Sequence, residues 1–180
     1  RAPASYTLVP HTTRLRSRIA TGGERSAALT VGLGDYAGDL GVQRTKEGTE
    51  SRYAREVVVN AARAAGLQAI DTVHSDVSDP EGLKAAVREA RGLGFEGKGC
   101  IHPRQIALVH EAFLPTDAEV ERACAIVRAF RVAEEQGLGV VSLGSKMIDP
   151  PVVKRAQKTV EQALEGGLLG ADWLDEEGGA

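Results

Sequence analysis

The chain of 180 residues is 42% hydrophobic and 26% charged, with a formal net charge of −3, a balance typical of a globular protein of about one domain. Its mild acidity gives no electrostatic reason to expect nucleic acid or an anionic membrane as a partner. No stretch reaches the roughly 18 consecutive apolar residues of a membrane span. Two cysteines are too few for a disulfide framework, which favours a reduced, cytoplasmic setting. The sequence starts with Arg1 and not Met, so we expect its natural start upstream, and nothing near Arg1 resembles a signal peptide.

An apolar run over residues 27–31 predicts a buried strand, and a glycine-rich segment with two carboxylates follows it directly. This segment, GLGDYAGDLG at residues 32–41, places Asp35 and Asp39 four residues apart. We expect a turn at the carboxyl end of the strand, where α/β proteins place their chemistry. A carboxylate there can bind Mg²⁺. The alternative is that Gly and Asp only form a turn.

Strand and helix signals then alternate. Helical spacing predicts a helix over about residues 47–65, and residues 67–73 favour the next strand. Asp79 before Pro80 predicts an N-cap with a proline in the first turn of a further helix. Residues 97–103 favour a short strand and a turn. Repeated strand–helix units with short loops imply a parallel sheet or a (β/α) barrel.

The last third of the chain is dominated by helix signals. Thr116 and Glu119 form the pattern of a capping box before a long helix. A short apolar piece leads to the segment GSKMIDPP at residues 144–151, and a final helix is predicted to about Leu164. The acidic tail, residues 171–180, is expected to be flexible.

Four segments in order resemble the citrate lyase β-subunit-like and malyl-CoA lyase family, within the HpcH/HpaI aldolase/citrate lyase superfamily. They are GLGDYAGDLG, RTKEGTESRYAREVVVNAARAAGLQAIDTVHSDVSDPEGL, GFEGKGCIHPRQIALVHEAF and GSKMIDPPVVKRA. The resemblance implies an α/β fold, a (β/α)₈ TIM-type barrel of the phosphoenolpyruvate/pyruvate superfamily that is partial in this chain. It also implies Mg²⁺-dependent cleavage or formation of a carbon–carbon bond next to an acyl-CoA thioester.

The resemblance assigns roles at the first and third segments. Asp35 matches the family's metal-binding Asp, and the backbone N–H groups around Gly34 and Asp35 match the binding place of the substrate carboxylate. The segment that lines coenzyme A matches the region of Lys98, with Ile101, His102 and Pro103 as expected contacts. Lys98 or Arg104 could meet a phosphate. For His102, an ordinary turn residue before proline is the alternative.

In the fourth segment, Asp149 matches a residue that transfers a proton in the active site of a neighbouring subunit. The alternative is an N-cap followed by proline, and one residue can do both. We therefore expect a barrel portion over residues 1–136, an extension over 137–170 that serves a neighbouring subunit, and a flexible tail over 171–180. The family implies a homo-oligomer, a trimer or a hexamer.

Residues 5–10, SYTLVP, resemble two different strands of the family. In one alignment they match its first strand, and a large internal segment is then absent, since such a barrel takes about 250 residues. In the other they match the strand that bears the metal-binding Glu, with Pro10 or His11 in its place. Under either alignment the second carboxylate ligand and the family's substrate-binding arginine are not visible.

The sequence therefore predicts a Mg²⁺-dependent acyl-CoA carbon–carbon lyase of the citryl-CoA or malyl-CoA type. The alternatives are a shortened relative that binds coenzyme A without catalysis, a structural subunit, or an acyl-CoA thioesterase of the same family. The expected partners are a small acyl-CoA substrate and further copies of the chain.

Overall fold

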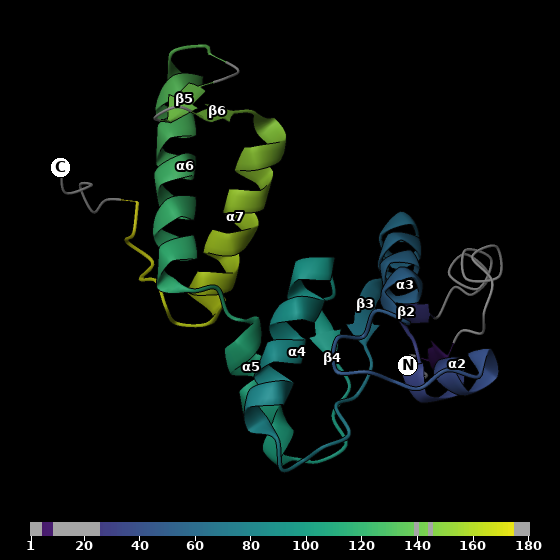
Figure 1. Cartoon of the computed structure of the whole chain (residues 1–180). Coiled ribbons are helices and arrows are strands. Elements are labelled where there is room, and N and C mark those ends of the chain that lie inside the picture. The colour runs from purple at the N-terminus through teal and green to yellow at the C-terminus, as the bar shows by residue number, and fades with distance from the viewer. Residues whose placement is uncertain (1–4, 9–25, 139–140, 144–145, 175–180) are drawn as a thin grey trace. The chain divides into compact units, whose positions relative to one another are not determined.

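The computed structural model describes residues 5–8, 26–138, 141–143 and 146–174. Figure 1 labels its elements, and their bounds are β1 (Ser5–Leu8), β2 (Ser26–Thr30), α2 (Leu33–Leu40), α3 (Arg52–Ala64), β3 (Gln68–Asp71), α4 (Pro80–Leu93), β4 (Gly97–Lys98), α5 (Arg104–Phe113), α6 (Asp117–Glu135), β5 (Val141–Leu143), β6 (Lys146–Ile148) and α7 (Pro150–Glu165). The chain divides into two compact units, residues 1–113 and 114–180.

A four-stranded parallel sheet in the order β1-β2-β3-β4 lies at the centre of the first unit. This confirms the α/β class with a parallel sheet, although no closed barrel is formed by the residues described. Strand β1 pairs in parallel with β2. Pro10 and His11 themselves lie outside the described residues.

The sheet is held against α3 by an apolar core. Leu29 of β2 and Ala69 of β3 are fully buried, and Val58 and Ala62 of α3 pack in the same cluster. Burying one such Leu or Val side chain stabilises the fold by about 1.5–3 kcal/mol. The core therefore lies between the sheet and α3, and it determines which face of each strand is buried against the helix.

The termini of α4 follow the sequence signals. The Asp79 carboxylate accepts a hydrogen bond from the Gly82 backbone N–H at 2.8 Å, and Pro80 occupies the first turn, as predicted. The helix ends at Gly94, whose φ of +99° favours glycine, and a Cβ there would lie 3.0 Å from Val59. A further cluster joins α4 to α5 through Leu83, Val87, Val109 and Ala112.

One expectation about local structure was wrong. The glycine-rich segment is not a turn but forms α2, whose Leu33 and Ala37 are buried. Residues after His102–Pro103, for which no element is predicted from the sequence, form α5, which packs its apolar face on α4. None of the helices in the described part of the chain is both long and apolar enough to span a membrane.

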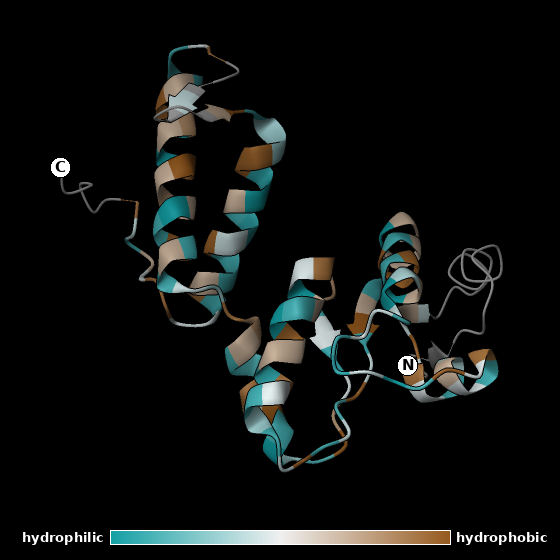
Figure 2. Cartoon of the chain, in the orientation of Figure 1, coloured by the Kyte–Doolittle hydropathy of each residue, from teal (hydrophilic) through white to brown (hydrophobic). Residues whose placement is uncertain are grey.

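In the second unit, α6 packs along α7 and β5 pairs antiparallel with β6. Figure 2 shows apolar and polar residues alternating around both helices. The predicted capping box is present: the Thr116 hydroxyl accepts from the Glu119 N–H, and the Glu119 carboxylate accepts from the Thr116 N–H. Trp173 is only 6% exposed and packs in this core, and the flexible tail expected over residues 171–180 stays a prediction.

The division between the units, after Phe113, differs from the expected boundary at residue 136. Helix α6 groups with α7 because both bury apolar faces in one cluster. The contribution of residues 137–170 to a neighbouring subunit stays a prediction.

Candidate functional site

The carboxyl ends of β2, β3 and β4 lie at one edge of the sheet, because these strands are parallel neighbours. Three segments leave this edge: the start of α2, the loop over residues 72–78, and the loop over residues 99–103. In open and closed α/β folds, ligands bind at this edge. Two of the three segments carry residues that the sequence predicts to bind substrate, metal or coenzyme A.

Asp35 lies in the first turn of α2, and its side chain is exposed. Gly32 occupies the N-cap and has no side chain to bond the first N–H groups of the helix. A Cβ added at Gly34 would meet nothing within 4 Å. The start of α2 therefore presents open backbone N–H groups beside one carboxylate, an arrangement that favours an anion or an anion–metal pair.

The donor set near Asp35 fits a magnesium ion only in part. Mg²⁺ prefers oxygen ligands and is usually held by one or two carboxylates together with substrate oxygens and water. Asp35 supplies one such carboxylate from an exposed position. Within the described ranges, no three His, Cys, Asp or Glu side chains are grouped to hold a metal.

Lys98 is buried, whereas a lysine that contacts a phosphate is expected to be accessible. Its side chain is 3% exposed, and its ammonium donates to the Asp71 carboxylate at 2.8 Å. Asp71 and Lys98 are register partners on β3 and β4, so both side chains leave the same face of the sheet. The phosphate contact of Lys98 stays a prediction, and the exposed Arg104 is the cation of this region with free access to a ligand.

Asp71 is the centre of a buried ionic network. Its carboxylate, which is 0% exposed, accepts two hydrogen bonds from the Arg55 guanidinium of α3, at 3.0 and 3.1 Å. Arg55 also pairs with Glu89 of α4 at 3.0 Å and lies over the ring of Phe95. Burial alone would lower the pKa of Arg55, but the charges and hydrogen bonds of Asp71 and Glu89 raise it overall. The network ties the end of β3 to two helices and to β4.

The loop over residues 99–103 presents the predicted coenzyme A contacts. Ile101 is 53% exposed, and Pro103 is exposed as well. His102 is half-buried, and its Nδ1 accepts from the Arg104 backbone N–H at 3.1 Å. The neutral ring therefore carries its proton on Nε2. An exposed apolar surface with a hydrogen-bonding ring beside it suits the adenine or pantetheine part of a ligand.

The loop over residues 72–78 is held by its own hydrogen bonds. The Asp76 carboxylate accepts from the Ser78 hydroxyl at 2.6 Å and from the Ser78 backbone N–H at 2.8 Å. These hydrogen bonds lower the pKa of Asp76 below its ordinary value. His74 is half-buried, and its Nε2 lies 3.9 Å from an Asp79 oxygen.

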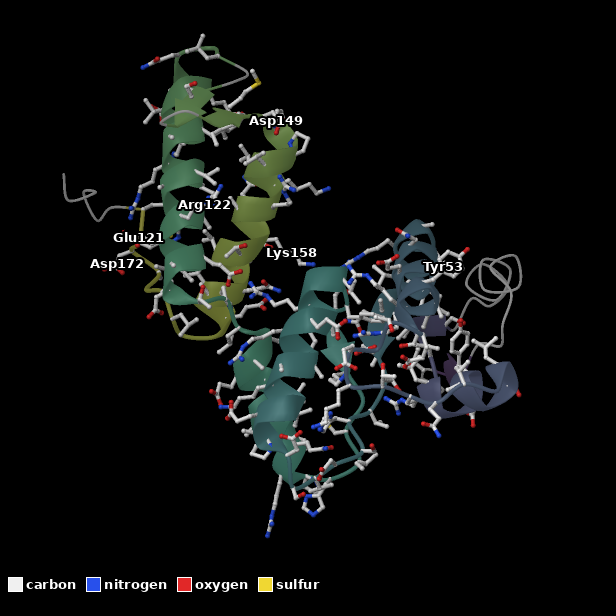
Figure 3. The ribbon with its side chains drawn as sticks, in the orientation of Figure 1. Tyr53, Glu121, Arg122, Asp149, Lys158 and Asp172 are labelled. Carbon is white, nitrogen blue, oxygen red and sulfur yellow. The ribbon has the colours of Figure 1, made fainter. Side chains whose placement is uncertain are left out.

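Asp149 is the N-cap of α7 in the second unit, as predicted. Its side chain accepts from the Val152 backbone N–H at 3.1 Å, with Pro150 and Pro151 in the first turn. Figure 3 labels Asp149 at the start of α7, and the residue is half-buried. Its capping role is therefore confirmed, whereas its catalytic role stays a prediction.

Comparison with known proteins decides the family. Residues 16–103 match the model of the HpcH/HpaI aldolase/citrate lyase family. This part of the chain belongs to the HpcH/HpaI aldolase/citrate lyase family. Among family proteins, citrate lyase subunit beta of Haemophilus influenzae is 44% identical over 83% of this chain and 52% of its own length. Citramalyl-CoA lyase, mitochondrial, of mouse is 40% identical over 76% of this chain and 40% of its own length.

The fold is shared with a solved structure. The protein CitE of Mycobacterium tuberculosis, crystallised with magnesium, acetoacetate and coenzyme A, superposes with a TM-score of 0.71. The sequences are 29% identical, and the match covers 84% of this chain and 57% of that one. This chain spans about half the length of the curated relatives it matches. The matches therefore cover most of this chain but only about half of each relative.

Sequence reasoning missed the network around Asp71 and the buried Gln105, whose amide hydrogen-bonds to the backbone of Ile101 and of His74. A signal for the network was present, because Arg55 falls on the apolar face of α3 and Asp71 at a buried strand position. A charge at such a position is almost always paired. For Gln105 no comparable signal exists, since glutamine in a first helical turn is ordinary.

Proposed function

We propose that this chain belongs to a Mg²⁺-dependent acyl-CoA carbon–carbon lyase of the citryl-CoA or malyl-CoA type, with a (β/α)₈ barrel assembled in a homo-oligomer. The observation that carries the proposal is the carboxyl edge of the parallel sheet. It presents the exposed Asp35 on an open helix start and an exposed apolar loop around Ile101, within a chain of this family. The crystallised relative with magnesium and coenzyme A supports the ligand class.

In this proposal each residue has a defined task. Magnesium, when bound, withdraws charge from the oxygens of the reacting acid and the enolate. Asp35 would hold the ion, and the N–H groups around Gly34 would bind the substrate carboxylate. Ile101, His102 and Pro103 would line coenzyme A.

Cleavage requires one proton to leave and one to arrive. The substrate hydroxyl passes its proton to solvent water as its carbon becomes a carbonyl, and the electron pair of the breaking carbon–carbon bond forms the thioester enolate. The enolate carbon then takes a proton, which gives acetyl-CoA from a malyl-CoA substrate. Asp149, reaching the site from a neighbouring subunit, is the proposed proton donor.

A non-catalytic relative that binds coenzyme A is the second candidate. The observation that favours it is the donor set, because the described residues group no three metal ligands around Asp35. Incubation with malyl-CoA, citramalyl-CoA or citryl-CoA and Mg²⁺ separates the candidates. A lyase releases an oxo acid and acetyl-CoA, a thioesterase releases free coenzyme A, and the non-catalytic relative binds the thioester without releasing either.

Removing the Asp35 carboxylate should abolish the binding of magnesium in the presence of an oxo acid. Asp35→Asn keeps the side-chain shape and loses the charge, so the heat of Mg²⁺ titration should fall to that of buffer. Glu81→Gln is the matched control, since Glu81 is an exposed acid in the first turn of α4. Equal heats for wild type and Asp35→Asn would exclude Asp35 as a ligand.

Reversing the charge of Arg104 should weaken coenzyme A binding. Its side chain is exposed next to the loop that presents Ile101, so a phosphate contact is worth roughly 2- to 10-fold in affinity and should shrink as salt rises. Arg104→Glu tests this by calorimetry, with Arg88→Glu, an exposed arginine of α4, as control. If both variants bind as the wild type does, the phosphates are contacted elsewhere.

A further inference from the structure

Gln105 is a polar side chain at only 2% exposure, and its amide joins two loops. The amide oxygen accepts from the Ile101 backbone N–H at 2.9 Å, and the amide nitrogen donates to the His74 backbone carbonyl at 3.0 Å. A carboxylate would offer no donor and an ammonium no acceptor. Glutamine therefore satisfies both groups at once.

The loops that Gln105 joins already touch at their base. The Gly99 N–H donates to the Asp71 backbone carbonyl at 3.0 Å, and a Cβ at Gly99 would lie 2.8 Å from the Val73 side chain. Gln105 adds a second connection further along both loops, at Ile101 and His74. The backbone of the 99–103 loop is thus held at Gly99 and again at Ile101.

We propose that Gln105 is a positioning residue, which holds the 99–103 loop against the 72–78 loop so that Ile101 and His102 meet an acyl-CoA. This inference rests on the proposed function. The Ile101 side chain is 53% exposed, and its backbone N–H is held by the buried amide of Gln105. A loop ordered before the ligand arrives loses less conformational entropy on binding.

Cys100 gives a direct measure of the loop. The sequence has two cysteines, of which Cys100 lies exposed in this loop and Cys124 is buried. The rate at which Ellman's reagent modifies the exposed thiol reports the mobility and accessibility of its backbone. Hydrogen exchange at the Ile101 N–H reports the bridge itself.

In the full chain, Gln105→Met replaces the amide by an apolar side chain of similar size and removes both hydrogen bonds. We expect the Ile101 N–H to exchange and the Cys100 thiol to react roughly 3- to 10-fold faster, the value of one hydrogen bond. The affinity for acetyl-CoA, which carries no free thiol, should fall by a similar factor in calorimetry. His110→Gln, an exposed change on the same helix, should alter none of these.

If the Ile101 N–H exchanges and the Cys100 thiol reacts at wild-type rates in Gln105→Met, the bridge does not hold the loop. If both rates rise but the affinity for acetyl-CoA is unchanged, Gln105 has no positioning role. A wild-type chain that does not bind acetyl-CoA overturns the proposed function and the positioning role with it, while the exchange and thiol rates still decide the bridge. If Gln105→Met does not fold, Gln105→Asn, which keeps the amide but shortens its reach, is measured under the same criteria.

Discussion

Asp71→Asn is expected to destabilise the chain by about 3–5 kcal/mol, the cost of removing one partner from a buried ion pair. Asparagine has nearly the shape of aspartate, so no cavity opens, but Arg55 and Lys98 lose their shared counter-charge in a buried layer. Urea unfolding followed by far-ultraviolet circular dichroism measures the loss as a lower midpoint at an unchanged slope.

Two variants separate this charge effect from general damage. Lys98→Met leaves the two hydrogen bonds between Arg55 and Asp71 in place, so its cost should be smaller, about 1–3 kcal/mol. Glu56→Gln breaks an exposed pair with Arg52 on α3 and should change stability by less than about 0.5 kcal/mol. A loss under about 1 kcal/mol in Asp71→Asn would show that the network is not needed for stability.

Asp149→Asn is expected to lower the turnover of a malyl-CoA-type substrate by about 10²- to 10⁴-fold, the usual contribution of a general acid or base. The amide oxygen can still accept from the Val152 N–H, so the N-cap of α7 is kept. The affinity for acetyl-CoA should stay at the wild-type value. Steady-state rates and calorimetry on the same preparations test both statements.

The second Asp-Pro cap in the chain provides the stability control. Asp79 accepts from the N–H three residues on and precedes Pro80, as Asp149 precedes Pro150. Asp79→Asn and Asp149→Asn should therefore each change the unfolding midpoint by a similar, small amount.

Wild-type turnover in Asp149→Asn would leave only its capping role. A wild type without turnover on any short hydroxyacyl-CoA would favour the non-catalytic relative.

Local signals in the sequence predicted the elements that have caps and long periodic faces. The Asp79–Pro80 start of α4, the Thr116 capping box and the cap at Asp149 are all present, because each is a contact between neighbours in the chain. The strand after residue 26 and the parallel sheet also follow from the alternating pattern.

The remaining features depend on contacts between distant residues. Lys98 is predicted to meet a phosphate, yet its charge is paired with Asp71, 27 residues away in sequence. The glycine-rich segment becomes α2 because Leu33 and Ala37 find a core to pack against, which overrides the turn preference of glycine. The amide of Gln105 bridges loops that only the pairing of β3 with β4 brings together.

The order of strands in the sheet bears on how the chain folds. Within the four-stranded sheet, the strands β1-β2-β3-β4 lie side by side in their order along the chain. The pairing of β3 with β4 joins residues as near as Ile70 and Gly97. Contacts that close short loops form faster than contacts between distant segments. We expect the sheet to grow one strand at a time from its amino-terminal edge, with each new strand–helix unit docking on a surface that already exists.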